Sequence, residues 1–261
     1  EDKDYEAFLS KPADCDQLYI GNFFCPFLFP DRDLLTKILM KACGEGMGIS
    51  IVLSYLRQEA VPRTKSLLSL LYDFCKENDM AMEVVIGDLG QLTLLKPYLS
   101  YLIPVLGPLL NKRRRDPRMK YKLGMDRHDR KDFSNMADSA EMKALFHEYG
   151  LHRIEEMSPG YEIGFTEGFH KTLHLPVCQT NTSQYCPLYA LYKYHDRGHQ
   201  EEPADCGKVC KCFGLSYPCH LHMFGSYNSL FFVDHETAGH RQWLENYLKE
   251  GVDRILWNLW I

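Results

Sequence analysis

Short apolar segments alternate with amphipathic stretches along most of this chain. The apolar segments predict strands at 17–22, 48–55, 82–88, 101–107, 151–157, 173–178, 229–234 and 253–260. Apolar residues at helical spacing predict helices at 32–43, 63–77, 138–149 and 236–250. The last helix is the clearest of these, because Trp243, Leu244, Tyr247 and Leu248 share one face and Gly251 is placed to end it.

This alternation predicts the fold class and the number of domains. Strands that alternate with helices over 261 residues favour an α/β fold of the TIM-like (β/α) barrel type, complete or distorted. A length of this order is sufficient for one hydrophobic core, so we expect residues 1–261 to form a single barrel domain. A doubly wound sheet is the structural alternative.

Two polar segments interrupt the alternation. Residues 111–138 are basic in their first half and lack apolar periodicity, which indicates an insertion. This segment is either a solvated loop, with residues 112–137 free of the core, or a lid or docking surface for an anionic partner. The second interruption, residues 178–220, is a loop-rich segment that contains many of the cysteines.

Charge and hydropathy exclude some classes of protein. The chain has 35 acidic and 30 basic residues, which gives a formal net charge of -5 and argues against a general nucleic-acid binder. No apolar run approaches the roughly 18 residues that span a bilayer, and the acidic start EDKDYEAFLS is unlike a secretory signal. We therefore expect a cytoplasmic protein without a membrane span.

The cysteines provide the strongest chemical signal. Ten cysteines in a chain without an export signal favour thiolates over disulfides. Cys206, Cys210 and Cys212 lie within seven positions, and thiolates held so close together repel one another unless a cation compensates. Spacing alone fits either zinc, with help from His195, His199, His220 or His222, or an iron-sulfur cluster.

The order of the motifs resembles one protein family. The segments LYIGNFFC (18–25), VVIGDLGQL (84–92), PVLGPLLN (104–111) and HRIEEMSP (152–159) precede a single cysteine and then a CxxxC pair. This pattern is similar to the collagenase-like peptidase family of unknown catalytic type. It is most similar to the branch of oxygen-independent hydroxylation proteins that act in anaerobic ubiquinone synthesis and RNA hydroxylation.

The resemblance implies a cofactor and its ligands. It implies a 4Fe-4S cluster held by Cys25, Cys186, Cys206 and Cys210, with zinc as the alternative metal. Cys212 could replace Cys210, and Cys178 is a weaker alternative because a thiol at a strand end is more often buried. The chain departs from the family pattern in the basic insertion and in NTSQYC (181–186) before the second ligand, so the substrate is not carried over.

The resemblance also implies a function, which stays open among three classes. The first is an iron-sulfur oxidoreductase that acts in or assists an oxygen-independent hydroxylation. The second is a noncatalytic, metal-stapled scaffold or subunit that binds a protein partner or a homologous subunit. The third is a peptidase-like hydrolase, although no Ser-His-Asp order, nucleophile elbow or HExxH motif supports it.

Polar residues at predicted strand ends are the candidates for catalysis. Asp88, Asn111 and Glu155 follow or end predicted strands, where a barrel places its chemistry. Asp88 and Glu155 could instead cap or pair with the next loop. His170 and His174 flank a strand without a carboxylate partner that the sequence reveals, so we expect a structural role for both.

Overall fold

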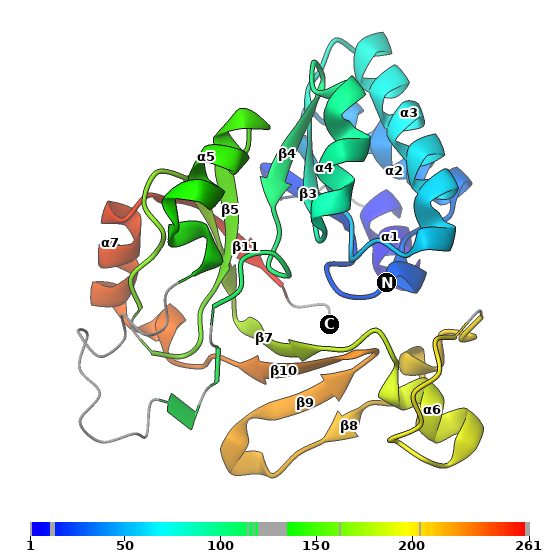
Figure 1. The fold of residues 1–261 in the computed structure, drawn as a ribbon, viewed down its shortest axis with the longest axis vertical. Coiled ribbons are helices and arrows are strands. Elements are labelled where there is room, and N and C mark those ends of the chain that lie inside the picture. Colours follow the sequence, from blue (N-terminus) through cyan, green and yellow to red (C-terminus); the bar gives the residue numbers. More distant parts are fainter. Residues whose placement is uncertain are drawn as a thin grey trace. The chain divides into compact units, whose positions relative to one another are not determined.

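The computed structural model divides the chain into two compact units (Figure 1). It describes residues 2–10, 14–113, 115–116, 118–119, 135–161, 163–203 and 205–258. The first unit comprises Glu1–Leu110 and Leu145–His152, and the second comprises Asn111–Ala144 and Arg153–Ile261. Much of the basic insertion predicted at 111–138 therefore lies outside the described residues.

The first unit contains a parallel sheet with the strand order β1-β2-β3-β4. These strands are β1 (Gln17–Gly21), β2 (Gly48–Val52), β3 (Met82–Ile86) and β4 (Leu102–Leu106). The helices are α1 (Asp2–Ser10), α2 (Arg32–Gly44), α3 (Val61–Glu77) and α4 (Leu89–Leu95), of which α2, α3 and α4 each connect two successive strands. The predicted alternation of strand and helix is confirmed in this unit.

The sequences of these strands are nearly continuous apolar runs because both faces of the sheet are buried. Val52, Val85 and Val105, from three neighbouring strands, pack into one cluster. Helix α2 buries residues at helical spacing, namely Leu35, Ile38, Leu39 and Ala42. The Asp31 side chain caps its first turn by accepting a hydrogen bond from the Leu34 backbone N–H at 2.9 Å.

The second unit also contains parallel strands, in the order β5-β6-β11. They are β5 (Arg153–Met157), β6 (His170–Leu175) and β11 (Val252–Trp257). Helix α7 (Arg241–Lys249) contributes Tyr247, Trp243 and Leu244 to an apolar cluster with Leu173 and Leu175 of β6. Leu248, which was expected on the same face, is 59% exposed. Gly251 follows the helix with φ +91°, as a helix-ending glycine should.

A separate antiparallel sheet completes the second unit, and the sequence pattern did not reveal it. Its order is β7-β10-β9-β8, and the strands are β7 (Val177–Thr182), β8 (Leu215–Ser216), β9 (Met223–Ser226) and β10 (Ser229–Val233). Helix α6 (Pro187–Tyr194) follows β7, and helix α5 (Ala140–Glu148) contributes residues to both units.

Two of the predicted strands are therefore corrected. The strand predicted at 173–178 is the end of β6 and the start of β7, with Pro176 between them, because proline donates no backbone hydrogen bond to a ladder. The strand predicted at 229–234 exists, but it pairs antiparallel with β7 and β9 rather than parallel with a barrel strand. Hydrophobic periodicity identifies a buried strand without specifying the direction of its neighbours.

The coarse fold class is confirmed as α/β with parallel strands in each unit. A closed barrel that comprises residues 1–261 as a single domain stays a prediction. Within the part of the chain that the structure describes, every helix is too short or too polar to cross a lipid bilayer.

Candidate functional site

Cys186 lies at the start of helix α6 in the second unit. Its side chain makes no capping hydrogen bond, but the backbone N–H groups of Tyr189 and Leu188, in the first turn of the helix, influence its thiol electrostatically. Burial raises the pKa of the Cys186 thiol, whereas these two N–H groups act in the opposite direction. The start of helix α6 therefore offsets part of the effect of burial on this half-buried thiol.

Two more cysteines are brought close to this helix. The charge of Cys206 contributes to the raised pKa of Cys186, so the two sulfurs interact electrostatically. Cys210 belongs to the short 3₁₀ helix Val209–Lys211, which packs against α6. Gly207 and Lys208 both adopt positive φ, and this bend turns the chain between Cys206 and Cys210. Cys212, the alternative ligand, is exposed.

Cys25 and Cys178 lie in different surroundings. Cys25 follows β1 in the first unit, where it is buried and its backbone N–H donates to the Asn22 side chain at 2.9 Å. Cys178 lies inside β7, and burial raises the pKa of its thiol to about 12. A thiol so resistant to ionisation is a poor metal ligand, in line with the expectation that this strand-end cysteine is buried.

The described residues do not assemble a finished metal site. Outside 120–134 and the other stretches that the structure leaves undescribed, no group of three or more histidine, cysteine or acidic side chains is arranged to hold a metal ion. The cysteines near α6 have the chemistry that iron or zinc requires, but the predicted set of four ligands is not tested.

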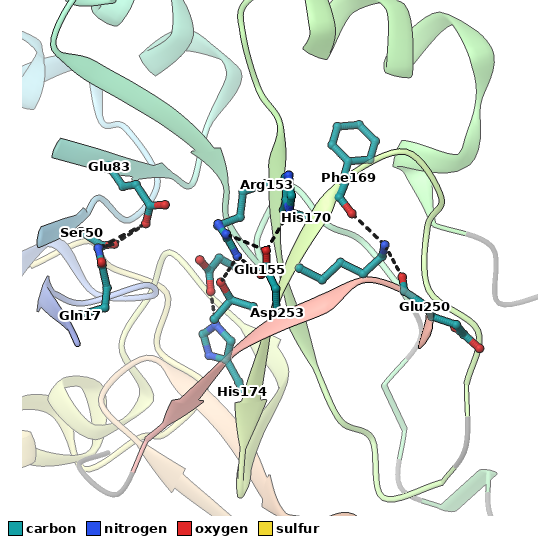
Figure 2. Close-up of polar contacts among 12 residues, drawn as sticks. Gln17, Ser50, Glu83, Arg153, Glu155, Phe169, His170, His174, Glu250 and Asp253 are labelled. Carbon is teal, nitrogen blue, oxygen red and sulfur yellow. Dashed lines mark hydrogen bonds and ion pairs between the residues drawn. The ribbon is translucent and has the colours of Figure 1, made fainter. Parts of the chain in front are cut away.

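A second polar centre joins the middle of β5 to the carboxyl-terminal part of β6. The Glu155 carboxylate and the His174 imidazole approach to 2.6 Å between Oε2 and Nε2, and both side chains are 0% exposed. Figure 2 shows the His174 ring directed at the carboxylate of Glu155. The β5–β6 register pairs Glu155 with Thr172 and Met157 with His174, so all four side chains share one face of the sheet.

Asn111 holds the backbone carbonyl of Glu155. Its side-chain amide donates to the Glu155 carbonyl at 2.8 Å, and its oxygen accepts a hydrogen bond from Asn135. Asn111 and Asn135 are both buried. The structure thus brings together two of the predicted catalytic residues, Asn111 and Glu155. The third, Asp88, belongs to the first unit and caps α4 by accepting from the Gly90 N–H, which is the local role considered as its alternative.

Two arginine side chains at the start of the basic insertion, Arg113 and Arg115, are buried rather than solvated. Arg115 is 6% exposed and donates to the Gln179 side chain at 3.1 Å and to the Asn111 carbonyl at 2.5 Å. Burial lowers the pKa of Arg115, while Cys178 and Glu156 act to raise it. Arg113 lies 3.8 Å from Glu156, whose side chain is 0% exposed. These arginines anchor the segment after β4 within the second unit.

A third polar cluster lies at the amino ends of β5, β6 and β11. Arg153 makes two hydrogen bonds to Asp253, at 2.6 and 3.2 Å, and the His170 ring lies 2.8 Å from the same carboxylate (Figure 2). Partial burial acts to raise the pKa of Asp253, but the hydrogen bonds and charges of Arg153 and His170 outweigh it and hold that pKa below its usual range.

Sequence reasoning missed His174 and Arg115. His174 was expected to be structural because its carboxylate partner is not visible from sequence spacing, since Glu155 comes from the neighbouring strand. The available signal was weak: Glu155 and His174 lie in two predicted strands, 151–157 and 173–178, that follow one another in the chain. Arg115 lies within a basic run, which on its own indicates a solvated segment.

The second unit therefore contains two kinds of chemistry. The thiols beside α6 can bind a soft metal, and the carboxylate–imidazole pair can hold or pass a proton. No protein-family model matches this sequence, and no curated protein shows significant similarity to it. The likeness to the oxygen-independent hydroxylation branch accordingly stays a prediction from the motifs.

Proposed function

We propose that this chain is an iron-sulfur protein that acts in or assists an oxygen-independent hydroxylation or a related redox modification. The observation that supports this most directly is the arrangement around Cys186. Cys186 begins helix α6, against which the Cys210 segment packs, and the charge of Cys206 acts on the Cys186 thiol. Several cysteine sulfurs gathered in one region are what an iron-sulfur cluster requires of its protein.

The proposed ligands are Cys186, Cys206 and Cys210 from the second unit and Cys25 from the first. A bound 4Fe-4S cluster would supply one-electron transfer. The residues of the chain would do the rest: α6 would stabilise the negative sulfur of Cys186, and the bend at Gly207 and Lys208 would aim two thiolates from one short segment. The resemblance also implies a (β/α) barrel, and the parallel strands in each unit are what such a barrel requires.

Metal analysis of the full chain purified without oxygen tests this proposal. We expect about four iron and four sulfide per chain and a broad absorption that dithionite bleaches. Cys186→Ala should lose this iron, while Cys178→Ala and Cys212→Ala, which remove cysteines outside the proposed set, should retain it. Cys25→Ala tests the predicted fourth ligand by itself.

The alternative results lead to different functions. About one zinc per chain would replace the redox function with a metal-stapled scaffold that binds a protein partner. Purified chain without metal, and with no uptake of iron and sulfide on anaerobic reconstitution, would contradict both. Iron retained in Cys25→Ala but lost in Cys212→Ala would keep the cluster and correct its ligands.

A further inference from the structure

Two exposed histidine rings meet at the end of the β9–β10 hairpin that is opposite its turn. His222 comes directly before β9, and His235 follows the end of β10 by two residues. Figure 1 shows these two strands side by side. The ring centroids of His222 and His235 are 5.1 Å apart, and the ring planes are inclined by 74°. Among the residues that the structure describes, neither side chain has a hydrogen-bond or ion-pair partner, so the ring nitrogens are available to a ligand.

The backbone holds His222 from both sides. Its N–H donates to the Cys219 carbonyl at 3.0 Å and closes the short turn Cys219–Leu221. Its carbonyl accepts from the Val233 N–H, also at 3.0 Å, which ties His222 to the end of β10. The φ of +50° at His222 is a conformation in which histidine occurs more often than most residues do. The hairpin therefore fixes where the His222 ring begins.

The backbone before and after His235 is held in a similar way. The N–H of Asp234 donates to the Pro176 carbonyl at 2.7 Å. The Asp234 carboxylate accepts from the backbone N–H groups of Glu236 and Thr237, at 2.9 and 3.0 Å. The separation of the two rings is thus set by two anchored segments, which is what a preformed site requires.

We propose that His222 and His235 together bind a divalent transition-metal ion of the zinc class. Imidazole is a preferred ligand of zinc and of its neighbours in the first transition row. Two imidazole nitrogens at about 2.0–2.1 Å from one tetrahedral ion place their ring centroids about 5 Å apart. The observed separation of 5.1 Å agrees with this value, so the ion fits between the rings with little change in their spacing.

Two protein ligands leave positions on the ion for other donors. Within the described ranges, no third histidine, cysteine or acidic side chain is arranged with this pair to hold a metal. A tetrahedral ion on two imidazoles has two further positions, which take water or an oxygen donor such as a carboxylate or a phosphate. The site thus differs from a closed structural zinc centre, and its ion should exchange readily. This inference does not depend on a cluster at the cysteines.

Nuclear magnetic resonance of ¹³C-labelled histidine side chains in the folded full chain, titrated with zinc chloride, tests the proposal. Each ring C–H signal reports on its own imidazole, so zinc bound by the cysteines alone is not mistaken for zinc at this pair. We expect the signals of His222 and His235 to shift together, with one shared dissociation constant. The His222→Asn and His235→Ala variants also assign the two signals.

These two variants test whether one ion is shared. Asparagine tolerates positive φ, so His222→Asn removes the imidazole and keeps the turn. It should raise the dissociation constant measured at His235 by at least about tenfold, because even the loss of an outer-shell partner typically costs 10–100-fold. His235→Ala should raise the constant measured at His222 to a similar extent.

The matched control is His220→Asn, which removes another exposed histidine of the same turn and leaves the pair intact. Its zinc affinity should stay within about twofold of the wild type, as for an ordinary surface substitution. Ring signals that do not respond to zinc, or that respond with different dissociation constants, would overturn the proposal. An equal loss of affinity in His220→Asn and His222→Asn would overturn it too, because the turn and not the pair would then hold the ion.

Discussion

Two carboxylate–histidine contacts on the same three strands differ in burial and in position. Glu155, in the middle of β5, and His174, near the carboxyl end of β6, are both fully buried, whereas Asp253 and His170, at the amino ends, are 41% and 68% exposed. The separations are similar, at 2.6 and 2.8 Å. Distance therefore does not distinguish the two pairs. Exposure to solvent distinguishes them, because water screens the exposed contact and does not reach the buried one.

The comparison indicates which pair can be broken with little loss of stability. An exposed ion pair contributes little to stability, and both of its members can return to water when the contact breaks. A buried pair that loses one member leaves the other without hydration. A large difference between matched variants at the two sites is the expected consequence.

The largest effect is expected from His174→Ala. Removal of the imidazole takes the His174 contact from the buried Glu155 carboxylate, so the free energy of unfolding should fall by about 3–5 kcal/mol. Chemical denaturation followed by circular dichroism measures this. The matched variant His170→Ala should change the same quantity by less than about 1 kcal/mol, and equal losses would mean that burial does not separate the two sites.

An intermediate effect is expected at alkaline pH, from the buried region beyond β6. Burial raises the pKa of Cys178 from 9.0 to about 12 in the folded chain, so the folded state keeps a proton that the unfolded state loses. This contribution to stability is complete below pH 9 and declines as pH rises toward 12, by up to about 1.4 kcal/mol per pH unit.

Denaturation of the wild type and of Cys178→Ala between pH 8 and pH 10 checks this expectation, with pH values chosen within the range where the chain refolds. The slope of stability against pH should be shallower in Cys178→Ala. An unchanged slope would mean that the thiol ionises in the folded protein and that this region is less apolar than its burial indicates.

A small effect is expected for the exposed pair, and its pH dependence is opposite to that of Cys178: stability is lost as the pH falls. The pKa of Asp253 is lowered in the folded state, so its contribution is present above the ordinary aspartate pKa and is lost as pH falls below it. Asp253→Asn should cost less than about 1 kcal/mol near neutral pH, because water screens a contact with a half-exposed carboxylate. The difference from the wild type should disappear in acid, and persistence there would assign it to packing instead.

The smallest effect is expected when both buried partners are replaced together. The double variant Glu155→Leu with His174→Met exchanges the ion pair for apolar groups of similar size, so its stability should lie within about 1 kcal/mol of the wild type or above it. A loss as large as that of His174→Ala would show that the pair makes further contacts that only polar groups satisfy.

The sequence alone determined the local elements of this protein. Periodicity located strands such as 17–22 and 82–88 and helices such as 32–43, because burial of one helix face or of both strand faces leaves a pattern within a few neighbouring residues. It also identified Asn111 and Glu155 as polar residues near strand ends. The close spacing of Cys206, Cys210 and Cys212 indicated a metal, and the family resemblance implied Cys186 and Cys25 as further ligands.

Only the tertiary structure decided which residues meet. The sequence of β10 is typical of a barrel strand, but this strand pairs antiparallel. The basic run around Arg115 indicates a solvated segment, but the Arg115 side chain is buried and donates to Gln179. His174 meets Glu155 because β5 and β6 are neighbours in a fixed register, which a segment cannot encode by itself. Pairing and register depend on the packing of distant segments, so the contact between Glu155 and His174 becomes visible only when the strands lie side by side.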